Sequence, residues 1–74
     1  MINLEFKVTE TLCDKDFKVS HFEVFDGINK IGDLYENISI EFAKTLNWRL
    51  FLENGKDIKE FNNFYDAFNY ISTL

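Results

Sequence analysis

Residues 47–74 constrain the fold of this chain most strongly, because a hairpin signal there is followed at once by a helix signal. A strand is predicted over 48–52, where apolar residues predominate, and a return strand is predicted over 57–61. Between the two strands stand Asn54 and Gly55, residues that both tolerate the positive φ angles of a two-residue type I′ loop. The sequence therefore predicts an antiparallel hairpin in this region.

The segment 63–74 is predicted to form a helix that lies across this hairpin. Asn63 is a favourable N-cap residue, and Asp66 places a carboxylate near the positive end of the helix. One apolar stripe recurs at intervals of three and four residues: Phe64, Ala67, Phe68, Ile71 and Leu74. These elements predict a sheet covered by a helix, and they do not indicate an active site.

Two strands are predicted in the first part of the chain. Apolar and polar residues alternate strictly over 2–8, which is the period of a strand with one buried face. The polar segment 10–16 is turn-like, and 17–25 resumes as a second strand that is antiparallel to the first. Asp26 and Gly27 then end this strand. This part of the chain is therefore expected to form a second hairpin.

The apolar residues of the second strand are out of phase with one another. Phe17 and Val19 point to one side of a regular strand, while Phe22 and Val24 point to the other. A bulge near residues 20–21 would place all the large side chains on the core face. We therefore predict a bulge in this strand.

The segment 33–46 fits either of two periods. As a helix, it places five apolar or aromatic residues on one side: Leu34, Tyr35, Ile38, Phe42 and Leu46. Asp33 and Glu36 then imitate a capping box. As a strand, the shorter run 38–42 alternates apolar with polar residues. The helix explains more residues over a greater length and is the preferred prediction.

The predicted fold is α+β, a single small domain spanning residues 1–74. Its order is ββαββα, with a mostly antiparallel sheet and with helices over 33–46 and 63–74 on one face. The alternative is a β-meander closed by one C-terminal helix. The expected core consists of Leu4, Phe6, Val8, Val19, Phe42, Leu50, Phe64, Phe68 and Ile71.

Charge and cysteine content narrow the function classes. Thirteen acidic against eight basic residues give a formal net charge of −5 at pH 7, which repels phosphate backbones and attracts basic surfaces. The single cysteine, Cys13, excludes an intramolecular disulfide, and the chain begins without the pattern of a signal peptide. No run approaches the roughly 18 apolar residues of a transmembrane helix. A cytoplasmic protein without a membrane segment is expected.

Catalytic and metal-binding patterns are weak in this sequence. His21 is the only histidine, and its acidic neighbours form no recognised motif. Cys13 lies beside Asp14 and Asp16, whose charges disfavour a thiolate. That acidic pair lacks the further oxygen ligands and the glycine of a calcium-binding loop. We therefore expect the chain to be no enzyme and to hold no metal or cofactor.

A binding surface accounts better for the aromatic residues, which make up 18% of the chain. Tyrosine and tryptophan are enriched at binding hot spots, and an acidic rim would steer them towards a basic partner. We expect a protein partner with a basic surface, such as a nucleic-acid-handling complex. The predicted partner-binding residues are Trp48, Glu53, Asp57, Glu60, Tyr65, Asp66 and Tyr70.

Two other uses of the surface stay open. Surplus apolar surface can be buried in a homodimer, whose interface is more apolar than that of a transient complex. Direct nucleic-acid binding would rely on three lysines of the first hairpin, Lys7, Lys15 and Lys18. Acidic residues interleave with these lysines and weaken the field that they project. Protein binding is therefore the preferred hypothesis.

Two resemblances accompany these patterns. The run 49–52, followed by Gly55, Lys56 and Ile58, is similar to the strand-turn-strand of ubiquitin-like β-grasp domains, which implies a homodimeric structural or adaptor domain. The short, acidic, Phe- and Asn-rich chain also resembles, in its overall profile, the small inhibitors that phages encode against host defence, anti-CRISPR proteins among them. This second resemblance implies a stoichiometric inhibitor that occupies a nucleic-acid-binding or assembly surface in the host cytoplasm.

Overall fold

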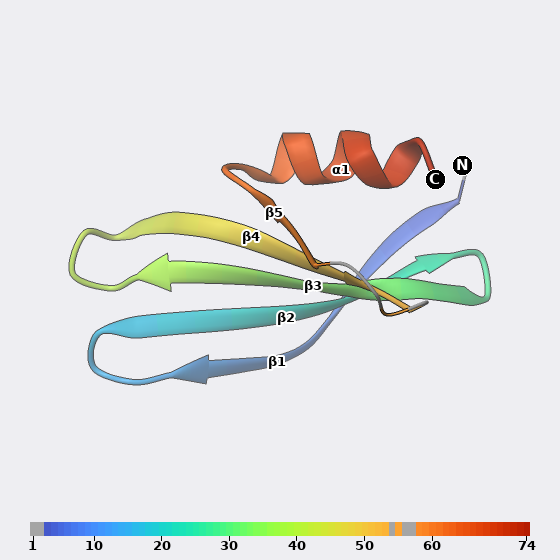
Figure 1. Cartoon of the computed structure of the whole chain (residues 1–74). Helices are drawn as coiled ribbons and strands as arrows, with labels where there is room; N and C mark the ends of the chain where they lie inside the picture. Colours follow the sequence, from blue (N-terminus) through green and yellow to red (C-terminus); the bar gives the residue numbers. More distant parts are fainter. Residues whose placement is uncertain (1–2, 54, 56–57) are drawn as a thin grey trace.

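The computed structural model describes residues 3–53, 55 and 58–74. In this part of the chain a five-stranded antiparallel meander pairs each strand with the next, and a C-terminal helix crosses one face (Figure 1). The elements are β1 (Leu4–Cys13), β2 (Phe17–Asp26), β3 (Asn29–Ser39), β4 (Lys44–Leu52), β5 (Ile58–Phe61) and α1 (Phe64–Ser72). This is the architecture of the alternative prediction, a β-meander closed by one C-terminal helix.

The predicted helix over 33–46, and with it the ββαββα order, is wrong. These residues belong to β3, to the turn after it and to the start of β4. Leu34 lies opposite Phe22 on β2 and Leu50 on β4, and it is fully buried. Pairing on both sides buries this position and satisfies its backbone groups. Strand pairing is therefore favoured here over the helix that the spacing of the apolar residues predicts.

The turn between β3 and β4 lies within the segment that was predicted as a helix. Ala43 adopts a positive φ of 52°, and its N–H donates to the Ile40 carbonyl at 3.2 Å. The Phe42 N–H donates to the Ser39 hydroxyl at 3.3 Å, and the Phe42 side chain is 67% exposed. The prediction of Phe42 as a core residue depended on the helix and is wrong with it.

The predicted bulge lies at the expected height of the first hairpin but on the opposite strand. Val8 pairs with Phe22 and Glu10 pairs with His21, which leaves Thr9 as the extra residue in β1. β2 keeps its regular alternation, so its first apolar residues stay on the face opposite to the later ones. Two further register shifts interrupt the pairing of β2 with β3 and of β3 with β4.

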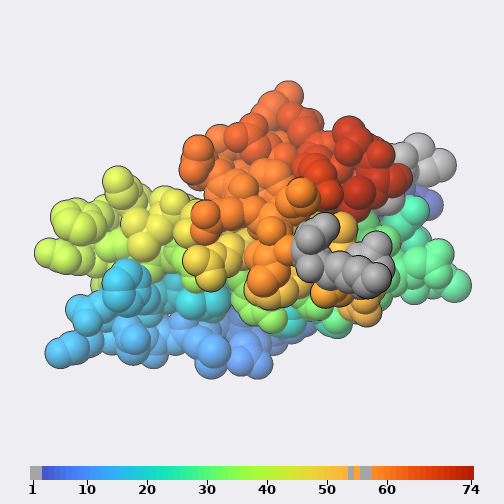
Figure 2. All heavy atoms as spheres, viewed as in Figure 1, coloured from blue at the N-terminus to red at the C-terminus, as the bar shows by residue number. Residues whose placement is uncertain are grey.

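The two faces of the sheet lie in different environments. α1 packs against one face, here called the covered face, and the opposite face is here called the open face (Figure 1). A helix of nine residues is about 14 Å long, whereas the molecule extends for 36 Å. The ends of the β1–β2 and β3–β4 hairpins therefore project beyond α1, as the space-filling view shows (Figure 2).

The core lies between α1 and the covered face. Phe6 connects the two, because its ring centroid lies 5.3 Å from that of Phe64 and 6.2 Å from that of Phe68 on α1. Trp48 also touches the helix, with its ring centroid 5.2 Å from that of Phe64. The buried apolar residues are Val24, Leu34, Trp48, Leu50, Ala67 and Ile71.

The predicted core is confirmed in part. Leu50 and Ile71 are buried, and Leu4 and Phe6 pack against the buried cluster. Val19 is half-buried on the open face, since β2 is regular. The prediction is wrong for three residues that are exposed: Val8 on β1, and Phe64 and Phe68 on the side of α1 that faces β1. In the described sheet β1 is an outer strand with a neighbour on one side, which leaves these residues accessible.

The start of α1 follows its local signal. Asn63 caps the helix as predicted, because its Oδ1 accepts from the Asp66 N–H at 2.8 Å. The Asn63 Nδ2 group also donates to Asp66 Oδ2 at 3.3 Å. The helix ends at Ser72, slightly before the predicted end. The short sequence pattern therefore predicts the beginning of this element correctly.

The last hairpin is confirmed as a pair of antiparallel strands, β4 and β5. β4 ends at Leu52 and β5 begins at Ile58. Gly55 has a positive φ of 74°, and its N–H donates to the Leu52 carbonyl at 2.8 Å. The predicted turn residue Asn54 and the predicted strand residue Asp57 lie outside the described residues.

Candidate functional site on the open face

Five apolar residues, one from each strand, run diagonally across the open face. Tyr35 on β3 lies two positions from the β3 partners of Val19 and of Phe51, which makes it a diagonal neighbour of both. The row continues outwards, because Val19 pairs with Leu12 on β1 and Phe51 pairs with Ile58 on β5. These residues are called the apolar diagonal: Leu12, Val19, Tyr35, Phe51 and Ile58.

The ends of the apolar diagonal are accessible and its centre is fixed by packing. Leu12 and Ile58 are 61% and 62% exposed, and Phe51 is also exposed. The half-buried Tyr35 ring stacks on His21, with centroids 4.6 Å apart and planes at 9°. The Tyr35 ring centroid lies 5.4 Å from that of Phe51, with the ring planes at 80°. The centre of the row therefore presents rings in a defined orientation.

A shallow hollow of about 190 Å³ lies at the middle of the apolar diagonal. Small-molecule sites usually enclose about 300–1,000 Å³, so this hollow is better matched to a single side chain of a protein partner. Arg49 on its rim donates from Nε to Glu60 Oε2 at 3.2 Å, which keeps the guanidinium at the edge. The hollow is lined by Val19, Tyr35, Asn37, Arg49 and Phe51.

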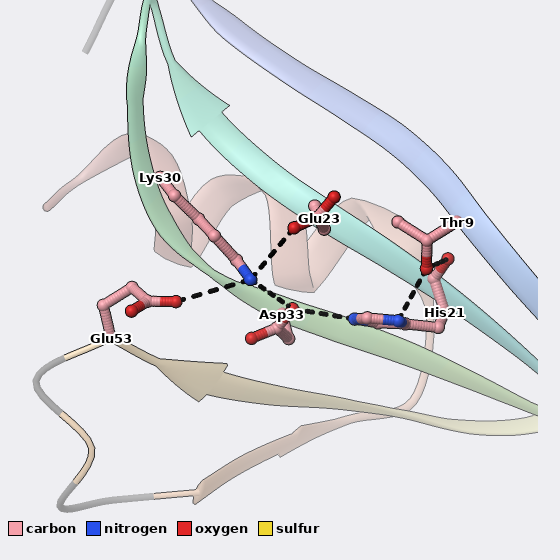
Figure 3. Close-up of polar contacts among 6 residues, drawn as sticks. All are labelled: Thr9, His21, Glu23, Lys30, Asp33 and Glu53. Atoms are coloured by element: carbon pink, nitrogen blue, oxygen red, sulfur yellow. Dashed lines mark hydrogen bonds and ion pairs between the residues drawn. The ribbon is translucent and has the colours of Figure 1, made fainter.

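On one side of the apolar diagonal, three carboxylates surround one ammonium group (Figure 3). Lys30 Nζ lies 3.0 Å from Asp33 Oδ1, 3.1 Å from Glu23 Oε2 and 3.6 Å from Glu53 Oε1. These groups come from β2, from β3 and from the residue after β4. This carboxylate cluster, Glu23, Asp33 and Glu53, therefore keeps a surplus of negative charge after Lys30 has been paired.

His21 joins the carboxylate cluster to the edge strand β1. Its Nε2 lies 2.7 Å from Asp33 Oδ1, and its Nδ1 lies 2.6 Å from Thr9 Oγ1 (Figure 3). Thr9 is the bulged residue of β1, and its hydroxyl also donates to the His21 carbonyl at 3.4 Å. The bulge therefore brings the threonine hydroxyl to the imidazole and ties three strands together.

The ionisation of the cluster follows from its contacts. Burial raises the pKa of Asp33, but hydrogen bonds from His21 and Lys30 outweigh it and hold that pKa below its ordinary value. Hydrogen bonds to Asp33 and Glu23 raise the pKa of Lys30 above its ordinary value. Both groups are therefore charged at neutral pH.

The order of hydroxyl, imidazole and carboxylate is the one found in acyl-transfer triads. Such chemistry also needs hydrogen-bond donors directed at a developing oxyanion. The β2 backbone around His21 is engaged with β1 on one side and with β3 on the other, and Tyr35 covers a face of the ring. The network is therefore better suited to bracing the sheet than to catalysis. Within the described ranges, no group of three ligands could hold a metal ion.

Two of the predicted partner-binding residues reach the open face. Glu53 belongs to the carboxylate cluster, and Glu60 on β5 binds Arg49. Glu60 Oε2 also accepts from Asn47 Nδ2 at 2.9 Å. Trp48, in contrast, is buried beneath α1, so its ring is not available to a partner. Of the predicted residues that the structure describes, Glu53 and Glu60 therefore adjoin the apolar diagonal.

The predicted residues of α1 lie on the other side of the sheet from the apolar diagonal. Tyr65 is 71% exposed, in agreement with its expected position outside the apolar stripe, and Asp66 is bound to the N-cap. Tyr70 is half-buried, with its ring centroid 5.6 Å from that of Phe61. Asp57 lies outside the described residues.

The central site residues that sequence analysis missed come from β3. Lys30, Asp33 and Tyr35 were not selected, and for Asp33 and Tyr35 the reason is that the segment 33–46 was interpreted as a helix. The alternation of Asp33, Tyr35 and Asn37 with Leu34 and its neighbours would have placed Asp33 and Tyr35 on one face of a strand. Lys30 reaches the same face through the register shift between β2 and β3, which no alternation predicts. The signal was present, but the helical spacing of the apolar residues obscured it.

Comparisons of the chain with protein-family models, with curated protein sequences and with solved structures give no match. Within the described part of the chain, no helix is both long enough and apolar enough to cross a membrane. The function must therefore be argued from the surface itself.

Proposed function

We propose that this chain is a non-enzymatic protein-binding domain that docks on its partner through the open face. The observation that supports the proposal is the apolar diagonal, which places one apolar side chain from every strand on the face opposite to α1. Exposed apolar rows of this kind mark interaction surfaces. Aromatic rings with fixed orientations, such as Tyr35 and Phe51, contribute affinity with little loss of side-chain entropy.

Charge defines the chemistry of the partner surface. The net charge of −5 and the carboxylate cluster beside the diagonal favour a surface that carries lysine or arginine side chains. The hollow next to Tyr35 and Arg49 would receive one side chain of the partner. The domain would then act as a stoichiometric inhibitor that occupies a basic nucleic-acid-binding or assembly surface, in the manner of the phage-encoded inhibitors that its profile resembles.

Direct nucleic-acid binding has less support. The Lys7 side chain lies on the open face, because Lys7 is the register partner of Glu23. Lys18 is an odd number of residues from Glu23 along the regular strand β2, so its side chain points to the covered face. Lys15 lies in the turn between β1 and β2. The three lysines therefore do not combine into one patch, and the acidic surface repels phosphate.

Affinity purification from the native host, followed by mass spectrometry, tests the proposal. The wild-type domain and a Tyr65→Ser variant should both retain the same protein partner. A Leu12→Ser/Ile58→Ser variant should lose it, because both ends of the apolar diagonal are removed while the core is untouched. With the purified partner, we expect the Kd to rise at least about tenfold for the open-face variant.

Tyr65→Ser is a matched control, because it removes a similarly exposed apolar group from α1. Loss of the partner on Tyr65→Ser, together with unchanged binding of the open-face variant, would move the site to the helix and refute the proposal. Recovery of nucleic acid alone, released when Lys7, Lys15 and Lys18 are substituted, would replace protein binding with the nucleic-acid alternative.

A further inference from the structure

The strand β1 lies at one edge of the sheet formed by the described strands. Among the described strands it pairs with β2 alone, and its ten residues make it much longer than the other edge strand, β5. A long edge strand presents a row of backbone N–H and C=O groups to any other strand of suitable sequence. The Thr9 bulge interrupts this row, so the regular part consists of Leu4 to Val8.

The direction of the free backbone groups follows from the hydrogen bonds. The Gly27 N–H donates to the Asn3 carbonyl at 3.0 Å, so the backbone groups of Asn3 point towards β2. Backbone groups alternate in direction along a strand. Those of Leu4, Phe6 and Val8 therefore point outwards, away from the sheet.

The sequence of this segment is complementary to itself in the antiparallel direction. It reads Leu4-Glu5-Phe6-Lys7-Val8, with opposite charges placed symmetrically about Phe6. If two copies pair with Phe6 opposite Phe6, each Glu5 lies opposite Lys7 of the other copy. Each Leu4 then lies opposite Val8 of the other copy. We infer that a second copy of this chain docks along β1 in this register.

The register agrees with the backbone geometry. Leu4, Phe6 and Val8 carry the outward groups, so the pairs that they form exchange both of their N–H···O bonds. Glu5 and Lys7 then occupy the closer, non-hydrogen-bonded pairs, where opposite charges interact best. Registers centred on Glu5 or on Lys7 would place two like charges opposite each other, which is unfavourable. The register centred on Phe6 is therefore selected over its neighbours.

The apolar surface beside β1 favours the same arrangement. Val8 is 63% exposed on the covered face, and the Phe64 and Phe68 rings that contact Phe6 are also exposed. Pairing of the two β1 strands places each Val8 opposite Leu4 of the second copy, and it puts the Phe64 and Phe68 rings of both copies on the same side of the joined sheet. A two-fold contact of this kind is closed, so it yields a dimer rather than a larger assembly. Residues opposite each other share a face, so both apolar diagonals lie on the same side of the joined sheet.

Charge reversal tests the pairing without disturbing the core, because the Glu5 and Lys7 side chains are exposed. Sedimentation velocity over a range of concentrations should show a dimer for the wild type. Glu5→Lys and Lys7→Glu each create two pairs of like charge in a homodimer, so each should raise the dimer Kd at least about tenfold. The double variant Glu5→Lys/Lys7→Glu restores opposite charges and should recover the dimer.

A mixture of the two single variants supplies an independent test. Glu5→Lys carries two positive charges at these positions and Lys7→Glu carries two negative ones, so the mixture should form heterodimers although each variant alone is monomeric. In the dimer, the Phe6 and Val8 amides should be protected from hydrogen exchange. A wild-type mass that stays monomeric, or a dimer that is indifferent to all these substitutions, would overturn the inference.

Discussion

The covered face and the open face follow the same alternation of side chains but use it differently. On the covered face, Val24, Leu34 and Leu50 are buried beneath α1 and form the core. On the open face, the corresponding row is the apolar diagonal, whose ends are exposed and whose flank is charged. A small domain with one short helix covers one face of its sheet. Stability is therefore concentrated on the covered face, and the open face is available for recognition.

The largest effect on stability is expected from the covered face. Leu34→Ala removes a fully buried side chain at the centre of the sheet and should lower the free energy of unfolding by about 2–5 kcal/mol. Small domains have only about 5–15 kcal/mol in total. Urea denaturation at pH 7 measures the change. A loss below about 1 kcal/mol would show that the core does not lie under α1.

A second substitution tests how closely β3 and β4 approach each other at Gly32. A Cβ atom added at Gly32 would lie 2.6 Å from the Phe51 carbonyl oxygen, so Gly32→Ala forces β3 and β4 apart. We expect a loss of about 1–3 kcal/mol. Gly27→Ala is the control, because its site is open and only its positive φ of 64° opposes a side chain, at about 1–2 kcal/mol. A loss below about 1 kcal/mol at Gly32 would contradict the close pairing of β3 with β4.

A smaller, pH-dependent effect is expected from the carboxylate cluster. The pKa of Asp33 is lower in the folded state than its ordinary value of about 3.9. Its contribution to stability is therefore complete above about pH 4–5 and is lost as the pH falls through the folded-state pKa. Asp33→Asn should reduce the difference in urea midpoint between pH 7 and pH 3. An unchanged difference would show that other carboxylates carry the acid sensitivity.

The smallest effect on stability is expected on the apolar diagonal. Leu12→Ser should change the free energy of unfolding by no more than about 0.5 kcal/mol, because the side chain is largely exposed. The same substitution, combined with Ile58→Ser, should abolish partner binding. Thermal unfolding and binding measured on the same preparations separate the two roles. A large loss of stability would mean that the diagonal serves as a second core.

Local patterns predicted the elements whose signals lie close together in the sequence. The Asn63 cap and the helix after it depend on contacts within one or two turns, and both are found in the structure. The segment 33–46 failed for the opposite reason. Its residue Leu34 is buried by partners on β2 and β4 that lie far away in the sequence, and no local spacing reports them.

The candidate site was predicted less completely than the fold elements. Glu53 and Glu60 were identified from charge alone and do lie beside the apolar diagonal. Trp48 was selected as an anchor because its residue type is common at interfaces, but the strand face covered by α1 buries it. The diagonal itself depends on the register of all five strands, and the Thr9 bulge alters that register. Such pairings could not be derived from the alternation within single strands.

The most direct test is an NMR titration of the isotope-labelled domain with the purified partner. Binding through the open face should shift the signals of Leu12, Val19, Tyr35, Phe51 and Ile58, which come from all five strands. The signals of Tyr65 and Asn69 on α1 should stay in place. Shifts confined to α1, with the five residues of the apolar diagonal unchanged, would contradict the assignment of the open face as the binding surface.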